Sequence, residues 1–456
     1  MTEQQGAALL QDPAVRAYIY GYPMVYDLDE AISMTTKPKI SIGAPVNRFA
    51  HATVLSGPDD KFVSLNNDTL YSIANCDVTS EPLVLHLPST GERYRVMQFV
   101  DVWTNNFAYL GTRATGNGEG LFLLAGPNWT GDVPEGMSLV QAPTNVFSIV
   151  GRHAVDGMAD VPNVEAIQQE TWLTPLSAYP NVSDGSDRKM GDWDMAPYDT
   201  RVGDDLVFWE KFRAWLKLFP PPTEEDAFVA RLEPLGLLAD ESPYVDPDPK
   251  LAAMLRAAQA NGHAAIPILS KQGAKTVNGW ASAAHLFDYN LYRLGPGTID
   301  APEWKQSDSK VVYAMRAIAA DGGLWGNHGY EAYYAWSFVD GDGNQLNGAN
   351  RYVMHFDTPP PAKAFWSVTM YDIPHYYLVD NPIDRYSIGD RTPGLIMNVD
   401  GSLDLYLQRD EPTDPKAKAN WLPTPADDFR PLVRIYLPEV PVLDGTYKLP
   451  PIQKVS

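Results

Sequence analysis

Residues Val63–Arg113 constrain the fold most, because they hold the densest run of strand-like sequence in the chain. Leu83–Leu87 and Tyr94–Phe99 are short segments of apolar or alternating residues, and the turn-forming residues Pro88 and Gly91 lie between them. Segments of this kind are typical of antiparallel β-strands. The stretch therefore predicts a β-sheet built from short strands.

A helical block is expected between two β-rich parts of the chain. Gly21 and Pro23 should break or kink the first helix, and Asn261-Gly262 should end the third. The expected helices cover Asp12–Thr35, Asp204–Phe219, Asp248–Asn261 and Ser309–Ala320. Strand-like segments then return at Tyr333–Val339, Tyr352–Phe356, Ala364–Tyr371, Leu403–Leu407 and Leu432–Leu437.

The size of the chain predicts more than one domain, because 456 residues exceed the usual extent of a single core. Arg93–Phe99 resembles Arg351–Phe356, which fits two related β-sandwiches in tandem. We therefore expect a mainly β fold of the α+β class. Its parts would be an N-terminal β domain with a leading helix (1–176), a linker and helical block (177–325), and a C-terminal β domain (326–456).

Charge and cysteine content exclude several classes of protein. A net charge of −22 argues against nucleic acid and anionic membrane surfaces as partners, because both demand a basic patch. Cys76 is the only cysteine, so it is expected to be a small buried side chain rather than part of a disulfide or a cysteine cluster. Neither an export signal nor an apolar run of membrane-spanning length is visible, so we expect a cytoplasmic protein.

Several motifs resemble two families that occur in tandem, the domains of unknown function 1254 and 1214. The motifs of the first are Gly21-Tyr22-Pro23, Asn67–Ser72, Arg93-Tyr94 and Gly126–Trp129. Those of the second are Glu331–Tyr334, Phe365–Asp372, Arg385–Ser387, Asp400–Ser402, Asn420–Pro423 and Arg434–Tyr436. The resemblance implies two tandem jelly-roll β-sandwich domains with a helical block between them, and it implies no agreed reaction.

Two amide-rich clusters at strand ends are candidate sites. In the first, Asn66 and Asn67 can bind a substrate carbonyl or hydroxyl while Asp68 accepts a proton beside Tyr71. The alternative is a turn held by its own side chains. The second cluster places Asp101, Trp103 and Asn105 on one face of an extended segment, as in a ligand pocket. Its alternative is a strand end with an exposed carboxylate.

Metal and cofactor signals are weak. His285 and Asp288, and likewise His328 and Glu331, are spaced as metal ligands or as an acid–base couple would be on a helix. Two such pairs do not make a metal site, and Asp340–Asn344 is read as a hairpin turn rather than a calcium loop. Serine-hydrolase, P-loop and Rossmann motifs are missing from the sequence. We therefore expect neither metal nor cofactor.

Arginines in the β-rich parts are expected to pair with carboxylates, although one can hold an anionic substrate group. These arginines are Arg113, Arg351, Arg385 and Arg434.

The polar and aromatic clustering predicts a cofactor-independent enzyme acting on a small uncharged or aromatic metabolite. Asp101 or Glu331 would be the general base, Tyr71 or Tyr334 the acid, and Trp366 part of the pocket wall. Hydrolysis, elimination and isomerisation all fit. The alternatives are a non-catalytic small-molecule binding protein and a capsid-like assembly protein. A small homo-oligomer is expected.

Overall fold

The computed structural model describes residues 10–38, 42–60, 64–181, 189–273, 275–282, 284–289 and 292–455. Val63 and residues 182–188 of the expected linker lie outside the described residues. The fold is mixed α/β, and its strands form four open sheets. In the described part of the chain, no helix combines the length and apolarity that a bilayer crossing requires.

The first β region follows the first helix and contains two sheets. Sheet A has the order β1-β2-β8-β4-β5, and sheet B has the order β7-β6-β3-β9. The strands are β1 (Phe49–His51), β2 (Thr69–Asp77), β3 (Leu83–Leu87), β4 (Arg95–Asp101), β5 (Asn106–Gly111), β6 (Gly120–Ala125), β7 (Met137–Gln141), β8 (Val146–Ala154) and β9 (Trp172–Pro175).

The second β region also contains two sheets. Sheet C has the order β10-β11-β12-β18-β14-β15, and sheet D has the order β17-β16-β13-β19. The strands are β10 (Lys275–Val277), β11 (Trp280–Ser282), β12 (Ala332–Ser337), β13 (Arg351–Phe356), β14 (Ala362–Asp372), β15 (Ser387–Gly389), β16 (Leu403–Gln408), β17 (Trp421–Pro423), β18 (Phe429–Pro438) and β19 (Ile452–Val455).

The two β regions share one strand order. The run β2-β8-β4-β5 in sheet A corresponds to β12-β18-β14-β15 in sheet C, and β7-β6-β3-β9 corresponds to β17-β16-β13-β19. The parallel pair β6–β7 also has its counterpart in β16–β17. The similar segments Arg93–Phe99 and Arg351–Phe356 lie at β4 and β13, whereas the counterpart of β4 is β14. Their likeness therefore does not follow the structural repeat.

Each β region buries apolar side chains from both of its sheets in one cluster. In the first region Ala74, Phe99 and Phe147 of sheet A lie in the same cluster as Leu85 and Leu124 of sheet B. Cys76 is fully buried in that cluster, as expected, and burial raises the pKa of its thiol. Burial of these alternating side chains is the main stabilising contribution to each pair of sheets.

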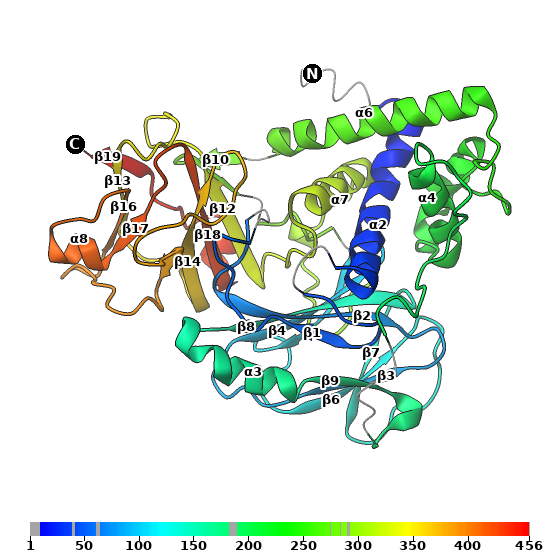
Figure 1. Ribbon diagram of the computed structural model, residues 1–456, viewed down its shortest axis with the longest axis horizontal. Helices are drawn as coiled ribbons and strands as arrows, with labels where there is room; N and C mark the ends of the chain where they lie inside the picture. The colour runs from blue at the N-terminus through cyan, green and yellow to red at the C-terminus, as the bar shows by residue number, and fades with distance from the viewer. Residues whose placement is uncertain are drawn as a thin grey trace.

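A layer of helices covers part of the outer face of sheet A (Figure 1). The helix α2 packs against α4, α6 and α7, so it belongs to the helical layer in space although it precedes the strands in sequence. The α-helices are α2 (Pro13–Thr36), α3 (Val161–Gln169), α4 (Val207–Leu218), α5 (Asp226–Val229), α6 (Pro249–Gly273), α7 (Ser309–Gly323), α8 (Pro415–Ala419) and α9 (Val440–Leu443). Short 3₁₀ turns cover Met158–Asp160, Leu176–Ala178, Thr223–Glu225, Ala230–Leu235 and Pro302–Trp304.

Two expected helix breaks do not occur. The helix α2 continues through Gly21 and Pro23, and α6 continues through Gly262. A Cβ atom at Gly21 would lie 2.6 Å from the ring of Phe212, and one at Gly262 would lie 2.3 Å from the ring of Tyr18. These glycines therefore permit close contact between helices. Local sequence signals alone predict a helix end at such a glycine, because glycine is common at helix C-termini.

We expect Gly262→Ala to lower the free energy of unfolding by about 1–3 kcal/mol, because the added methyl group overpacks the contact with Tyr18. Helix propensity alone would give a gain of about 1 kcal/mol. Gly322→Ala in α7 is the matched control, since nothing lies within 4 Å of its Cβ position. Urea unfolding of both variants measures the difference. Equal effects would contradict the packing role of Gly262.

Candidate functional site

The outer face of sheet C, on the side away from sheet D, carries a row of polar side chains. Tyr334 on β12 pairs with Arg434 on β18, which pairs with Ser367 on β14. Because side chains alternate along a strand, these residues lie on the opposite face from Val433 and Val368, which are in the apolar cluster of the second β region. The polar face of sheet C therefore points away from its own core.

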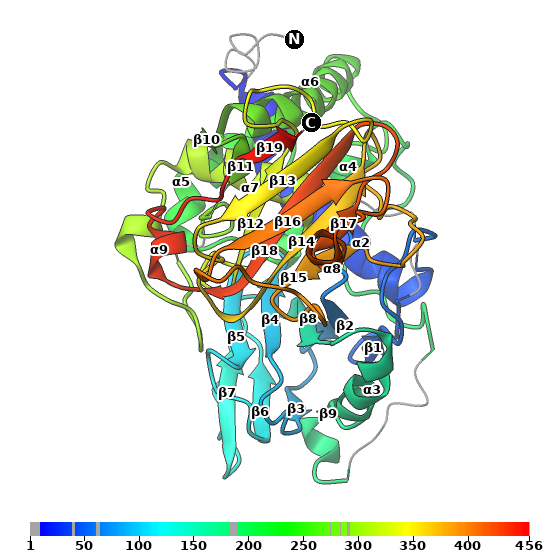
Figure 2. The ribbon, with the colours of Figure 1, turned by 90° about the vertical axis from the view of Figure 1, so that its left-hand side faces the viewer.

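The outer face of sheet A carries an equivalent pair. Tyr71 on β2 pairs with Arg152 on β8, just as Tyr334 pairs with Arg434 on the corresponding strands. The guanidinium carbon of Arg152 lies 5.2 Å from the centre of the Tyr71 ring. The second β region lies next to sheet A in both ribbon views (Figure 1 and Figure 2), and Val96 and Tyr109 of sheet A share a buried apolar cluster with Phe365 and Tyr436 of sheet C. We call the residues that meet there the inter-region cluster: Asn66, Asp68, Tyr71, Tyr94, Arg113, Arg152, Glu331, Tyr334, Ser367, Arg434 and Tyr436.

Asp68 joins the first β region to the second. Its Oδ2 accepts a hydrogen bond from Ser367 Oγ at 2.7 Å, and the Tyr436 hydroxyl lies 3.5 Å from the same oxygen. Asn66 Oδ1 accepts from the backbone N of Asp68 at 2.6 Å, so the predicted turn is present. Asn66 Nδ2 also donates to the Tyr436 hydroxyl at 2.9 Å. The Oδ1 atom of Asp68 bonds to no described residue.

Glu331, from the second β region, binds residues of the first. Its Oε2 accepts from Arg113 Nε at 2.5 Å, and its Oε1 accepts from the Tyr94 hydroxyl at 3.2 Å. Burial raises the pKa of Glu331, although the charge of Arg113 opposes the shift. The ring of Tyr436 lies 5.7 Å from that of Tyr94, which places Asp68 and Glu331 at two sides of one aromatic pair.

The structure separates Asp101, Trp103 and Asn105 from this cluster. Tyr94 directly precedes β4 and Asp101 is its last residue, so about 23 Å of strand lies between them. Asp101 accepts hydrogen bonds from the backbone N of Trp103 and of Asn105, at 2.9 and 2.8 Å, and from Asn105 Nδ2 at 3.0 Å. Burial raises the pKa of Asp101. The second candidate cluster is therefore a buried turn, and Trp103 Nε1 donates to the backbone O of Phe219 beneath the helical layer.

Two further candidates also lie outside the cluster. Trp366 is 3% exposed, lies in the apolar cluster of sheets C and D, and has its ring centre 5.6 Å from that of Phe356. Alternation puts it on the face opposite to Ser367. Asn67 Nδ2 donates to the backbone O of Ser56 and so supports a loop.

The histidine pairs behave differently from each other. His285 Nδ1 contacts Asp288 Oδ2 at 2.5 Å, and its Nε2 lies 3.2 Å from the backbone O of Leu443. Burial opposes protonation of His285, but the hydrogen bond and charge of Asp288 raise its pKa overall. His328 contacts the Tyr330 hydroxyl and does not pair with Glu331, and burial lowers its pKa to about 4.

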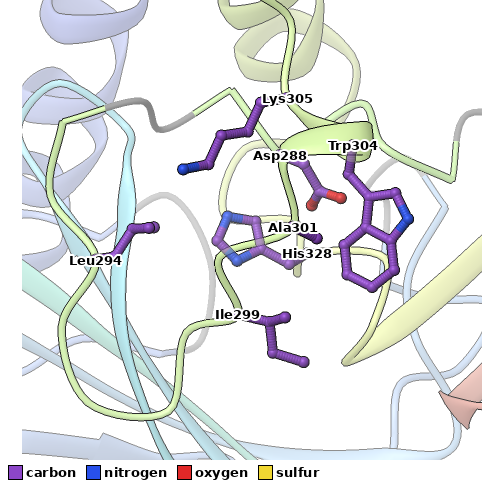
Figure 3. A pocket seen from close by; sticks show the side chains of 7 residues that line it. All are labelled: Asp288, Leu294, Ile299, Ala301, Trp304, Lys305 and His328. Atoms are coloured by element: carbon purple, nitrogen blue, oxygen red, sulfur yellow. The ribbon is translucent and has the colours of Figure 1, made fainter.

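His328 and Asp288 line a small pocket whose wall includes Trp304 (Figure 3). Its cavity volume of about 20 Å³ is enough for about one water molecule. Within the described ranges, no three His, Cys, Asp or Glu side chains are grouped so that they could hold a metal ion. The pocket is therefore a weaker candidate for a functional site than the inter-region cluster.

The remaining candidates from the sequence lie outside the inter-region cluster. Asp340 Oδ1 accepts from the backbone N of Asp342 and of Asn344, which forms the expected hairpin turn. Arg385 donates to the backbone O of Ala419 and of Trp421, and Arg351 is exposed on β13.

Sequence reasoning missed Arg152, Ser367, Tyr94 and Tyr436 as members of the cluster. Tyr94, Ser367 and Tyr436 stand in segments recognised as strand-like, but only the face of the strand makes each of them a candidate. The one sequence signal that indicates the face of a strand is alternation. Arg434 and Tyr436 are two residues apart in an otherwise apolar strand, so both lie on its polar face.

Fold and site together define a class of protein. It has two β regions whose strands follow the same order in their sheets, and the two regions meet at a buried polar cluster. The chain is a tandem DUF1254/DUF1214 protein. Residues 46–175 match the model of the protein of unknown function DUF1254, and residues 331–440 match that of the protein of unknown function DUF1214. The first match covers β1 to β9, and the second covers β12 to β18. The inter-region cluster is therefore formed by residues of both matched parts, at the place where they meet.

Among solved structures, the VPA0106 protein from Vibrio parahaemolyticus is similar over 98% of this chain and 99% of its own, with 23% identity and a TM-score of 0.73. This likeness shows a shared fold. An uncharacterized protein from Burkholderia cenocepacia aligns over 99% of this chain and 94% of its own, with 13% identity and a TM-score of 0.44. No curated protein matches the chain.

Proposed function

We propose that the inter-region cluster is the active site of a cofactor-independent enzyme that performs acid–base chemistry on a small metabolite. The observation that supports this is the meeting of Asp68, Tyr71, Glu331 and Tyr334 from distant parts of the chain at one interface. Carboxylates and phenols held in a buried setting are groups that transfer protons in enzymes.

Asp68 is the proposed general base. Ser367 orients its Oδ2, while Oδ1 bonds to no described residue and is available to take a proton. Tyr71 and Tyr334 are the proposed acids, because both are half-buried and so remain reachable from solvent. Both oxygens of Glu331 accept hydrogen bonds from the protein, which makes it a positioning residue for Tyr94. Hydrolysis, elimination and isomerisation all remain possible with these groups.

The test is to incubate the purified full chain with a library of small metabolites and to measure their conversion by mass spectrometry. For any converted metabolite, Asp68→Asn is expected to slow turnover by about 10²–10⁴-fold, the usual contribution of a general base. Asp410→Asn changes an exposed carboxylate and is expected to leave the rate unchanged. Full activity of Asp68→Asn would overturn the assignment.

A non-catalytic binding protein is the second candidate, because most donors and acceptors of the cluster already bond to each other. It predicts that Asp68→Asn changes ligand affinity modestly and that a bound metabolite is recovered unaltered. Recovery of a chemically changed ligand decides for the enzyme.

We also propose that each β region is a jelly-roll sandwich and that the protein is a small homo-oligomer. Strands that alternate between two sheets and share one apolar cluster support the first statement. Sedimentation velocity tests the second, and a monomer at every concentration would contradict it.

A further inference from the structure

Two buried arginines of the inter-region cluster donate hydrogen bonds to neutral acceptors. Arg434 is 4% exposed and donates to Thr369 Oγ1 and to the Tyr371 hydroxyl, both at 2.9 Å. Arg152 is 5% exposed and donates to Gln98 Oε1 at 2.7 Å and to the backbone O of Trp325 at 2.8 Å. Within the described residues, neither guanidinium forms a salt bridge with a carboxylate, and the charges of Asp68 and Glu331 act on Arg434 and Arg152 only without direct contact.

The cluster and its border hold more positive than negative charge. Arg113 is paired with Glu331, whereas the Asp68 carboxylate accepts its hydrogen bond from Ser367 rather than from an arginine. Arg430 is also buried nearby and lies 4.2 Å from the centre of the Tyr376 ring. Arg391, which donates to the backbone O of Asp68, is paired with Asp156. Five guanidiniums and three carboxylates therefore lie at the cluster and its border. The excess is notable in a chain of net charge −22.

Buried charges without a hydrogen-bonded counterion are costly, so a protein that retains them normally provides an anionic partner. The guanidinium group suits an oxyanion, since its parallel N–H groups match a carboxylate. Arg152 and Arg434 occupy corresponding positions in the two β regions, each opposite a half-buried tyrosine. The repeat thus brings two Tyr–Arg pairs to one interface, where the rings can contact the body of a ligand and the cations its charge.

We propose that the inter-region cluster binds a small aromatic carboxylate, with its charge at Arg152 and Arg434 and its ring beside Tyr71 and Tyr334. The proposal deepens the proposed function and rests on it for the identity of the substrate, which becomes anionic rather than uncharged. An aromatic body is favoured because Phe365 and Tyr436 stack with ring centres 4.2 Å apart beside the same charges.

The experiment is isothermal titration of the full chain with benzoate, with its neutral analogue benzamide, and with inorganic phosphate. Benzoate is expected to bind more tightly than either of the others. Arg434→Gln and Arg152→Gln should each weaken benzoate binding on the order of 10–100-fold, the value of a lost charge-assisted hydrogen bond. Arg351→Gln removes an exposed arginine and should leave binding unchanged.

Thermal unfolding without ligand separates a binding role from a structural one. Because neither Arg152 nor Arg434 has a hydrogen-bonded carboxylate, their glutamine variants should unfold at about the temperature of the wild type or higher. A marked drop in midpoint would make them structural partners and would overturn the proposal. Tyr71→Leu and Tyr334→Leu test the aromatic half of the site, because each removes a ring beside the ligand and should weaken benzoate binding several-fold.

Equal binding of benzamide, binding of phosphate alone, or binding of no probe also overturns the carboxylate site. Benzoate binding without turnover of any metabolite would leave the site standing and remove the proposed catalysis. Turnover of a neutral metabolite without carboxylate binding would support the proposed catalysis and overturn the carboxylate site.

Discussion

Replacing Arg113 with methionine is expected to lower the free energy of unfolding by about 3–5 kcal/mol at neutral pH. Glu331 is 1% exposed and depends on Arg113 Nε, 2.5 Å away, for its only ion pair within the described residues. Loss of the cation leaves a buried carboxylate uncompensated. Arg113 also lies 4.7 Å from the centre of the Tyr330 ring, and methionine retains part of this packing. Urea unfolding measures the difference.

The loss should depend on pH in a stated direction. Burial raises the pKa of Glu331 above its ordinary value of 4.5, and removing Arg113 takes away the charge that opposes this shift. A carboxyl group with a raised pKa in the folded state favours folding below its unfolded pKa, and that contribution is lost as the pH rises through the folded pKa. The variant should therefore regain stability relative to the wild type as the pH falls toward 4.5.

The double variant Arg113→Met/Glu331→Gln is the control. Because it removes the cation and the charge together, most of the stability lost in the single variant should return. If the double variant is as unstable as the single one at every pH, the ion pair is not the source of the loss.

Tyr436→Ala is expected to have a comparable effect, a loss of about 3–5 kcal/mol. Tyr436 is 1% exposed, stacks on Phe365 at 4.2 Å, meets Tyr94 at 5.7 Å and accepts a hydrogen bond from Asn66. Its removal opens a cavity at the interface between the β regions. We therefore expect the regions to unfold in separate transitions in this variant, as followed by calorimetry.

Two comparisons isolate the cause. Tyr436→Phe keeps the ring and should lose only about 1 kcal/mol, the net value of a hydrogen bond. Tyr406→Ala removes a half-buried ring from β16, away from the interface, and should cost less than Tyr436→Ala. A single transition of unchanged midpoint in Tyr436→Ala would show that the interface does not couple the two regions.

The candidate site was predictable only in part. Asp68, Tyr71, Glu331 and Tyr334 were recognised from clusters of polar and aromatic residues, and the structure places them together. Asp101 has the same local signature as Asp68, yet its hydrogen bonds close its own turn. Local composition does not distinguish these two outcomes, because both need an aspartate at a strand end.

The sequence by itself determined the alternation of apolar residues, and therefore the two β-rich parts and their helical interval. It also located the strands β3, β4, β12, β13, β14, β16 and β18. The tertiary structure alone decided which strands correspond between the regions and which faces meet. Pairing of distant strands, such as β2 with β8, sets the register that places Tyr71 opposite Arg152. That register depends on contacts between residues far apart in the chain, which no local pattern encodes. The same reason explains Gly262, whose place in the helix α6 follows from the ring of Tyr18.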